Sequence, residues 1–332
     1  MTNPSTTPRT SLPITLRPAT RADLPSIARL HAAAFANFEI YDWILPYRHE
    51  HPEQFYRYLL HRNKKLFVQP DVQYYIAEAP RRAVERAVAE RVGKKGDEDE
   101  VRATAGRRRQ DGVTREGGIH KQHTSQDADQ DEMTPLGFAC WEALGTSPLA
   151  SRWATTNNTL SNKLERLLLP LERTYTQYFL NRVADYNSFT SLRARFGDSW
   201  ADVPDHQILH LQFLITGPEF QGLGVGGKLL EWGFEVARRE GLPMGLESSY
   251  AGTEFYGRKG FRVVGELVIE DWTGKGRPTT RTPLMAWEGK EREGRWLEED
   301  GMGGWRWKKR GRAMGNEERE ALEPSDIALG ET

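Results

Sequence analysis

Apolar and polar positions along the chain predict alternating strands and helices, grouped around one glycine-rich turn. Residues 208–215 are mostly apolar, and Gly217-Pro218 closes the run, so we expect a buried strand there. Downstream, apolar residues recur at helical spacing until Gly241-Leu242-Pro243 stops the pattern. Between the two lies Gln221-Gly222-Leu223-Gly224-Val225-Gly226-Gly227, which holds four glycines in six residues. The unit is therefore predicted as strand, glycine turn and helix.

The first part of the chain predicts a strand, two helices and a further strand. Ile14-Thr15-Leu16-Arg17 alternates like a short strand, and apolar positions from Leu24 to Phe35 recur at helical spacing. A second helix is predicted over 52–62, and the apolar run at 72–78 predicts the next strand. The two helices are joined by 38–47, a segment unusually rich in aromatic residues.

Two long segments interrupt this pattern. Residues 81–134 are highly charged with almost no large apolar side chain, so burial cannot offset their ordering entropy and we expect disorder, with 81–91 transiently helical. Residues 147–203 carry leucines at helical spacing, predict a helix interrupted or kinked at Pro170, and thus form a predicted helical insertion. This insertion is a candidate lid over a ligand site, with a purely structural pair of helices as the alternative. The hairpin partner of the strand at 72–78 is predicted at 136–142.

The two ends of the chain have different compositions. Residues 1–12 are rich in Thr, Pro and Ser, and we expect them to be flexible. They also lack the apolar run of a signal peptide. Residues 261–270 and 282–287 predict the last two strands. The tail 289–332 is dominated by Glu, Arg and Gly, and we expect it to be largely disordered. Its tryptophans could dock a short segment on the body; they are Trp296, Trp305 and Trp307.

Composition and net charge limit the expected cellular compartment and the expected binding partners of the protein. The chain has 332 residues and a formal net charge of −1, so it gives no overall attraction to nucleic acid or anionic membranes, and we expect neither as a partner. No apolar stretch approaches the length of a membrane span. The single cysteine, Cys140, excludes an internal disulfide and a cysteine-based metal cluster. We expect a soluble cytoplasmic protein, with the nucleus as the alternative because Arg107-Arg108-Arg109 resembles part of a nuclear-localisation patch.

A glycine turn at a helix start is suited to binding phosphate. Several backbone N–H groups have no intrahelical partner there, and the helix dipole favours negative charge. Glycines also let the backbone approach a ligand without a Cβ in the way. The sequence therefore predicts a phosphate-bearing ligand at this turn.

Three motifs compete for these residues. Gly222-x-Gly224-x-x-Gly227 matches a dinucleotide-binding fingerprint, and Glu247 lies 20 residues beyond Gly227, where a ribose-binding acid is wanted. That fingerprint should follow its strand at once, whereas residues 217–221 intervene here. The segment from Gly222 to Lys228 also resembles a P-loop, but Leu229 stands where Ser or Thr must hold magnesium. The P-loop reading therefore fails on chemistry.

The third motif combines the turn with a later aromatic segment. Gln221-x-x-Gly224-x-Gly226 is followed by a helix, a strand at 244–248 and then Phe255-Tyr256-Gly257-Arg258-Lys259-Gly260-Phe261. This order resembles the GNAT family, the GCN5-related N-acetyltransferases. The opening Leu16-Arg17-Pro18-Ala19-Thr20-x-x-Asp23-Leu24 resembles the first strand and helix of the same family.

The resemblance implies an α/β fold of the α+β kind. Its centre would be a mixed, mostly antiparallel sheet of six to seven strands with one central parallel pair, flanked by about four helices. The GNAT acetyltransferase domain would span 13–288 and contain the disordered insertion 81–134 and the helical insertion 147–203. In the family, the region of the aromatic segment 38–47 borders the acceptor site, and an aromatic satellite core is the alternative.

Members of this family move an acetyl group from acetyl-coenzyme A to an amine in one ternary complex. The resemblance thus implies acetyl-coenzyme A (acetyl-CoA) as cosubstrate, a primary amine of a small molecule or peptide as acceptor, and no metal. The pyrophosphate would rest on backbone N–H groups at the helix start, and the pantetheine arm would lie beside the central strand. The candidate cofactor-binding residues are Phe213, Leu214, Ile215, Gln221, Gly222, Gly224, Val225, Gly226, Gly227 and Lys228.

Two proton transfers need residues of their own. Tyr256 matches the family tyrosine that donates to the departing sulfur, with a packing role beneath Phe261 as the alternative. His210 lies eleven residues before Gln221, where some members carry a glutamate base, and an imidazole pKa near about 6.5 suits a base. Glu247, at the end of the following strand, is the other candidate base, directly or through a water.

Two other functions stay open at this point. A dinucleotide-binding oxidoreductase would explain the glycine spacing and Glu247, although no second nucleotide-binding half is visible. A protein of GNAT fold that only binds acyl-coenzyme A, as a sensor, would show binding without turnover.

Overall fold

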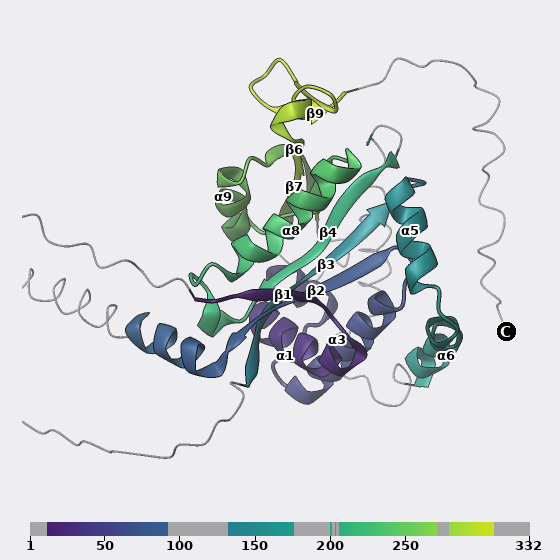
Figure 1. The fold of residues 1–332 in the computed structure, drawn as a ribbon, viewed down its shortest axis with the longest axis vertical. Coiled ribbons are helices and arrows are strands. Elements are labelled where there is room, and N and C mark those ends of the chain that lie inside the picture. The colour runs from purple at the N-terminus through teal and green to yellow at the C-terminus, as the bar shows by residue number, and fades with distance from the viewer. Residues whose placement is uncertain are drawn as a thin grey trace, which may run out of the picture.

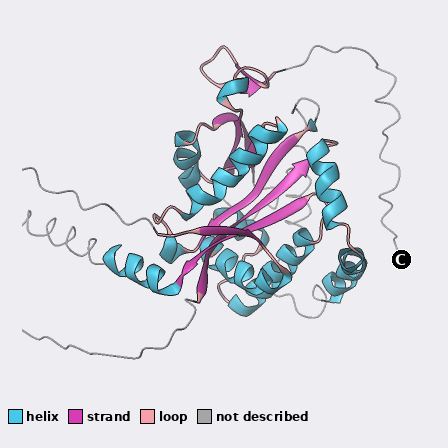
Figure 2. Ribbon diagram, in the orientation of Figure 1, coloured by secondary structure: helices cyan, strands magenta, loops and turns pink. Residues whose placement is uncertain are grey.

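One sheet crosses the fold, and helices pack on both of its faces (Figure 1, Figure 2). The structure is a computed structural model that describes residues 12–91, 132–175, 200, 203, 206–270 and 279–308. Among these residues, no helix is long and apolar enough to cross a membrane.

Seven strands form the central sheet, in the order β1-β2-β3-β4-β5-β7-β6. They are β1 (Thr15–Pro18), β2 (Val72–Pro80), β3 (Met133–Leu144), β4 (Ile208–Thr216), β5 (Met244–Glu247), β6 (Arg262–Ile269) and β7 (Thr280–Trp287). Neighbouring strands are antiparallel except β4 and β5, which run parallel. The predicted mixed, mostly antiparallel sheet with one central parallel pair is confirmed, and so is the hairpin of β2 with β3.

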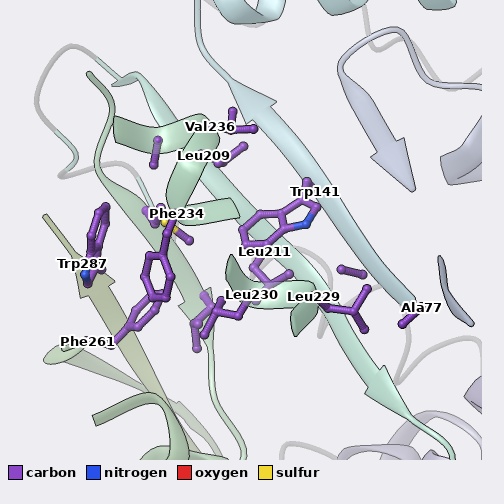
Figure 3. Packing of buried hydrophobic residues seen from close by; sticks show 14 of the residues in the cluster. Ala77, Trp141, Leu209, Leu211, Leu229, Leu230, Phe234, Val236, Phe261 and Trp287 are labelled. Carbon is purple, nitrogen blue, oxygen red and sulfur yellow. The ribbon is translucent and has the colours of Figure 1, made fainter. Parts of the chain in front are cut away.

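Helix α8 (Val225–Glu240) covers one face of the sheet, over β3 and β4. Its apolar side chains meet those of the strands in the largest buried cluster, where Leu229, Leu230 and Phe234 lie close to Trp141 and Leu211 (Figure 3). A Cβ at Gly233 would lie 2.2 Å from the indole of Trp141, so the ring occupies the space that a larger residue would need. This close contact fixes α8 on β3 and thereby places the glycine turn at its N-terminus.

Helices α1 (Leu24–Phe35) and α3 (Pro52–Phe67) cover the opposite face, where Ile27 and Leu30 pack with Phe138 and Phe213. The aromatic segment between them contains α2 (Glu39–Ile44), which packs Tyr41 against Leu59 of α3 in a smaller cluster. The other described helices are α5 (Pro148–Asn157), α6 (Leu160–Tyr175), α9 (Tyr250–Arg258), a helix at 81–91, and the short 3-10 helices Arg21–Asp23, Pro218–Phe220 and Lys290–Arg292.

The start of the charged insertion is more ordered than the transient helix expected at 81–91. Residues 81–91 form a helix directly after β2. Val84 is 5% exposed in the main cluster and Val88 packs beside it, so the helix has an apolar side that the charge-rich composition concealed. Pro80 pairs with Met133, which brings the other end of the predicted insertion into the sheet. Residues 92–131 lie outside the described residues.

The first part of the tail is also folded. Residues 289–308 contain a 3-10 turn and the two-stranded hairpin of β8 (Leu297–Glu299) and β9 (Trp305–Trp307). Trp296 and Trp307 are buried together with Trp200, and the guanidinium of Arg262 lies 3.5 Å from the Trp305 ring centroid. The tail was expected to be largely disordered from 289, but these tryptophans dock this segment on the body. Residues 309–332 lie outside the described residues.

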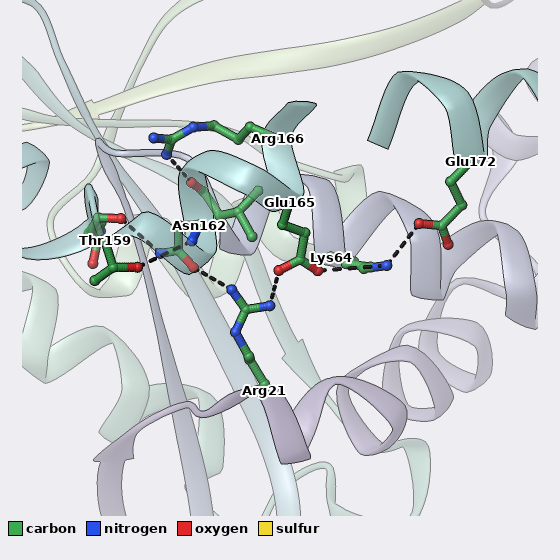
Figure 4. Close-up of polar contacts among 9 residues, drawn as sticks. Arg21, Lys64, Thr159, Asn162, Glu165, Arg166 and Glu172 are labelled. Atoms are coloured by element: carbon green, nitrogen blue, oxygen red, sulfur yellow. Dashed lines mark hydrogen bonds and ion pairs between the residues drawn. The ribbon is translucent and has the colours of Figure 1, made fainter. Parts of the chain in front are cut away.

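Helix α6 turns its polar side toward the body (Figure 4). Arg21 contacts Glu165, and Lys64 Nζ lies 2.8 Å from Glu172 Oε2. The leucines that predicted this helix face outward and are between 50% and 85% exposed; they are Leu160, Leu164, Leu167, Leu168 and Leu171. Pro170 lies inside the helix, which is not interrupted there, and the predicted continuation beyond Tyr175 falls outside the described residues.

Candidate active site

A bulge in β4 shapes the floor of the candidate site. Leu211 pairs with Trp141 and Phe213 pairs with Cys140, so Gln212 is one residue in excess of its partner strand. Because of this extra residue, Phe213 faces the α1 side of the sheet together with Cys140, while Leu211 faces α8. His210 lies opposite Glu142 on β3, two residues from Cys140, and therefore faces the α1 side as well.

Strands β4 and β5 pair over only a short length. Residues Leu209, His210 and Leu211 pair with Met244, Gly245 and Leu246, and β5 ends at Glu247. From Gln212 to Thr216, no described strand pairs with the β5 side of β4. The predicted pantetheine residues Phe213, Leu214 and Ile215 thus lie on a strand edge with free backbone N–H and C=O groups.

The glycine turn ends at the N-terminus of α8. Gly224 is the N-cap with φ +88°, and Gly222 has φ +78°, so both occupy the left-handed region that favours glycine. The first intrahelical bond runs from Lys228 N to Gly224 O at 3.0 Å, which leaves the N–H groups of Val225, Gly226 and Gly227 at the open helix end.

At position 226, the need for glycine comes from the space at the helix end and not from a positive φ. A Cβ there would lie 3.6 Å from Thr216 Oγ1 and 3.7 Å from the Phe255 ring, which is ordinary contact. The protein's own packing therefore tolerates a side chain at 226. The absent Cβ keeps space open at the helix end, as close approach of a ligand requires.

A cavity of about 1450 Å³ joins the turn, the free edge of β4 and the aromatic segment. The predicted residues that line it are His210, Phe213, Leu214, Ile215, Gln221, Gly222, Gly224, Gly226, Gly227, Glu247 and Tyr256. Two predicted residues do not line it. Val225 is buried in the main cluster, and Lys228 pairs with Glu231 on the exposed side of α8, with Nζ 3.2 Å from Oε2.

Tyr256 is on α9, at the wall of the cavity next to the turn. Its ring packs edge-on against Phe255 and Phe261, with centroids 5.1 and 5.6 Å away. Burial raises the pKa of Tyr256, so its hydroxyl keeps its proton at neutral pH. The packing and the proton-donor roles are thus compatible in one position.

His210 lies between two carboxylates. Its Nε2 is 2.8 Å from Glu247 Oε2, and its Nδ1 is 3.4 Å from Glu142 Oε2. Burial alone would lower the pKa of His210, but Glu247 and Glu142 together raise it to about 10. The imidazole is therefore charged at neutral pH, and in this arrangement it has no free nitrogen to accept a proton.

The pKa values of Glu247 and Glu142, which form a cluster with His210, are shifted in the opposite direction. Burial alone would raise the pKa of Glu247 and of Glu142, but the charged His210 lowers both. The cluster therefore holds two carboxylates and one imidazolium, a net charge of −1. Of the two bases considered from the sequence, Glu247 is the one that stays ionised and unprotonated here.

Sequence reasoning missed three residues of this cluster. Glu142 comes from β3, Trp200 from the helical insertion and Gln212 from the bulge, and all three line the cavity. Trp200 Nε1 donates to Glu247 Oε1 at 2.8 Å and its ring lies 5.3 Å from that of His210. Among the described residues of the 147–203 insertion, Trp200 alone lines the cavity.

The aromatic segment forms the far wall of the cavity. Phe38, Ile40, Tyr41 and Ile44 line it, while Ile40, Tyr41 and Ile44 also belong to the small aromatic cluster. The aromatic satellite core is therefore present, and the border of an acceptor site stays a prediction. Among the described residues, no group of three His, Cys, Asp or Glu side chains is arranged to hold a metal ion.

Comparison with known proteins finds one family model that matches part of the chain. Residues 189–261 match the family model described as the acetyltransferase (GNAT) family. No curated protein matches the sequence.

Several solved structures are similar to the chain at low identity. A histone acetyltransferase HPA2 and related acetyltransferase from Corynebacterium glutamicum is 16% identical, covering 82% of this chain and 94% of that one, with a TM-score of 0.43. A Drosophila melanogaster polyamine N-acetyltransferase is 12% identical, covering 83% and 100%, with a TM-score of 0.38. The PaiA N-acetyltransferase of Thermoplasma acidophilum, in complex with coenzyme A, is 13% identical, covering 83% and 99%, with a TM-score of 0.31.

The family match begins before β4, includes the whole glycine turn and α8, and ends at Phe261, just after the Tyr256 motif. Residues 189–261 thus match the GNAT acetyltransferase family model, and both the glycine turn and the Tyr256 motif lie within that match.

Proposed function

We propose that the protein is an N-acetyltransferase that moves the acetyl group of acetyl-CoA to a primary amine of a small molecule or peptide. One observation carries this proposal, the cavity of about 1450 Å³ that runs from the glycine turn to the His210 cluster. Ligand pockets usually hold about 300–1,000 Å³, so this cavity has room for a coenzyme and an acceptor together. The family match of residues 189–261 supports the same activity.

Two parts of the cavity suit the coenzyme. The N–H groups of Val225, Gly226 and Gly227 at the start of α8 would bind the pyrophosphate. The free edge of β4 at Phe213, Leu214 and Ile215 would pair with the amides of the pantetheine arm. Acetyl-CoA, when bound, supplies an acetyl group activated as a thioester.

The chain's own residues would move the protons. As the amine nitrogen forms its bond to the acetyl carbon and the C–S bond breaks, one proton must leave the nitrogen and one must reach the sulfur. Glu247 would take the first, directly or through a water, because His210 is already protonated. Tyr256 would donate the second, since its raised pKa keeps the hydroxyl protonated. His210 would hold Glu247 ionised and in place.

Thermal unfolding with two cofactors tests this proposal against its rivals. Acetyl-CoA at about a hundredfold excess over its dissociation constant should stabilise the full chain by about 2.7 kcal/mol, and NADH should not. Stabilisation by NADH instead would favour an oxidoreductase. Stabilisation by acetyl-CoA without acetylation of any amine would favour a coenzyme sensor.

A further inference from the structure

The part of the cavity next to the aromatic segment 38–47 holds a cation that has no anionic partner among the described residues. Arg62 of α3 lines the cavity, and its guanidinium lies over the Phe213 ring, 4.8 Å from the centroid. Its Nη1 donates to Tyr41 Oη at 3.0 Å. Across the described parts of the chain, no carboxylate forms an ion pair with this guanidinium within 4.0 Å. Within the described residues, this guanidinium at the cavity wall is therefore not neutralised by a carboxylate.

The groups around Arg62 are neutral. Burial raises the pKa of Tyr41, of Tyr74 and of the Cys140 thiol, so all three keep their protons at neutral pH. Burial, reinforced by Arg62, lowers the pKa of His31 well below its usual range, so that ring is uncharged. Arginine cannot escape its charge by losing a proton, and a buried charge without a partner is costly. The surroundings of Arg62 therefore favour binding of an anion.

The guanidinium is also held in position before any ligand arrives. Tyr41 Oη, which accepts from Arg62, is 3.1 Å from His31 Nε2, and His31 Nδ1 is 3.1 Å from Asn63 Nδ2. The Phe213 ring also contacts the guanidinium in a cation–π arrangement. A cation fixed by neutral partners in this way is suited to recognise a planar anion in a defined orientation.

The opposite charge lies further along the same strand. His210 is three residues from Phe213 on β4, and the bulge makes both face the same side of the sheet. The cluster of Glu142, His210 and Glu247 carries a net charge of −1, as argued above from its two carboxylates and one imidazolium. One compartment is therefore bordered by a negative group suited to an ammonium and by a positive group suited to an anion.

We propose that the acceptor is an amine that also carries a carboxylate, and that Arg62 binds this carboxylate. The inference rests on the proposed acetyl transfer and names the substrate class for it. A carboxylate matches the fork of a guanidinium through two parallel hydrogen bonds. The amine of the same molecule would lie toward Glu247, where it must lose a proton.

Paired acceptors test the substrate class with the full chain and acetyl-CoA. Glycine, β-alanine and γ-aminobutyrate are each compared with the alkylamine of equal carbon number, and putrescine and aminopropylphosphonate are added. We expect kcat/KM for the best carboxylate acceptor to exceed that of its alkylamine by about ten- to a hundredfold, the usual effect of a charged hydrogen-bonded pair. Equal or better turnover of the alkylamines or putrescine would overturn the inference, and so would a preference for the phosphonate.

A substitution tests the role of Arg62 itself. Arg62→Met keeps the unbranched apolar stem of the side chain and removes the charged guanidinium, so KM for the carboxylate acceptor should rise about ten- to a hundredfold, while kcat and the coenzyme affinity change little. Activity toward the alkylamine should fall much less than activity toward the carboxylate acceptor. Arg57→Met is the matched control, because Arg57 is on the same helix but pairs with Glu53 at the surface, 3.0 Å away.

Losses of equal size for both classes of acceptor in Arg62→Met, or no loss for the carboxylate, would overturn the inference. If Arg62→Met fails to fold, Arg62→Lys keeps the charge and should raise KM for the carboxylate acceptor alone. If no amine of either kind releases coenzyme A, the acetyl transfer itself is wrong. In that case, γ-aminobutyrate must still stabilise the chain more than butylamine does, and an equal shift of the melting temperature would overturn the Arg62 site separately.

Discussion

The imidazole of His210 contacts the carboxylate of Glu247, with 2.8 Å between Nε2 and Oε2. The two residues come from the only parallel pair of strands in the described sheet, where β4 and β5 begin to separate. Since Glu142 approaches the other ring nitrogen, the imidazole is held as a cation between two anions.

Stability should depend on pH through His210. Its folded-state pKa of about 10 exceeds the ordinary value of about 6.5, so the folded state binds this proton more tightly than the unfolded state. The resulting stabilisation is fully present below about pH 6.5 and is lost as the pH rises through about 10. Urea titrations across this range should show a falling free energy of unfolding for the wild type and a flatter profile for His210→Gln. His49→Gln, at an exposed position, serves as the control, and parallel profiles for all three would contradict the prediction.

Glu247→Gln should lower kcat by about a hundred- to ten-thousandfold, the range of general base catalysis, with little change in coenzyme affinity. Glu142→Gln should have a smaller effect, because Glu142 contacts the ring nitrogen remote from Glu247. In His210→Gln, the buried Glu247 loses the cation that lowers its pKa, so the acidic limb of kcat should move to higher pH. If the limb instead disappeared in His210→Gln, His210 would be the base.

Tyr256→Phe keeps the ring that packs on Phe261 and removes the donated proton. We expect kcat to fall about ten- to a thousandfold while the dissociation constant of acetyl-CoA stays the same. Tyr250→Phe is the matched control on the same helix, because the Tyr250 hydroxyl donates to Glu266 on the exposed side, at 2.9 Å. Equal kcat values for both variants would leave Tyr256 with a packing role alone.

Gly226→Val should abolish binding of acetyl-CoA while the protein stays folded. The nearest protein atom to a Cβ at 226 is 3.6 Å away, so the added side chain enters ligand space and not the core. Gly257→Val is the control, because a Cβ at 257 meets nothing within 4 Å. Gly224 is a poorer test, since its φ of +88° would strain any side chain. Calorimetric titration that found wild-type coenzyme affinity in Gly226→Val would assign the turn to another purpose.

Replacing 92–131 by a short glycine-serine linker should leave the fold and the coenzyme affinity intact, because the segment is highly charged. Extending the deletion back to Arg81 should be harmful, since it removes Val84, which is 5% exposed. Burial of one such side chain contributes about 1.5–3 kcal/mol. Chemical denaturation of both deletions measures the difference, and equal stability of the two would show that the helix at 81–91 contributes nothing.

The sequence predicted the parts of the site that depend on local order. The glycine turn, the helix after it and the Tyr256 segment each follow from a short run of residues. The strand pattern at 72–78, 136–142 and 208–215 likewise predicted three central neighbours of the sheet, because alternation and burial leave a local signature.

The rest of the site depends on contacts between distant residues. Glu142 reaches His210 only because β3 pairs with β4 in one register, and the bulge at Gln212 then turns Phe213 toward Arg62. A single bulge reverses the face of every later residue in a strand, and nothing in the sequence marks it.

Helix α6 is a second case in which the sequence predicted an element but not its contacts with the rest of the fold. Its leucine spacing predicted the helix correctly, but Leu160 and Leu167 are 85% and 72% exposed, while Glu165 and Glu172 contact Arg21 and Lys64 of the body. The spacing of apolar residues predicts that a helix has an apolar side. It does not predict the surface against which that side packs.

Acetyl transfer itself is tested most directly by following both products of one reaction. The full chain is incubated with acetyl-CoA and a mixture of primary amines that includes γ-aminobutyrate, and the free thiol and the acetylated amine are quantified by absorbance and mass spectrometry. We predict that both products appear in equal amounts with the wild type and that neither appears with Gly226→Val. Coenzyme binding to the wild type without any acetylated amine would contradict the proposed enzyme.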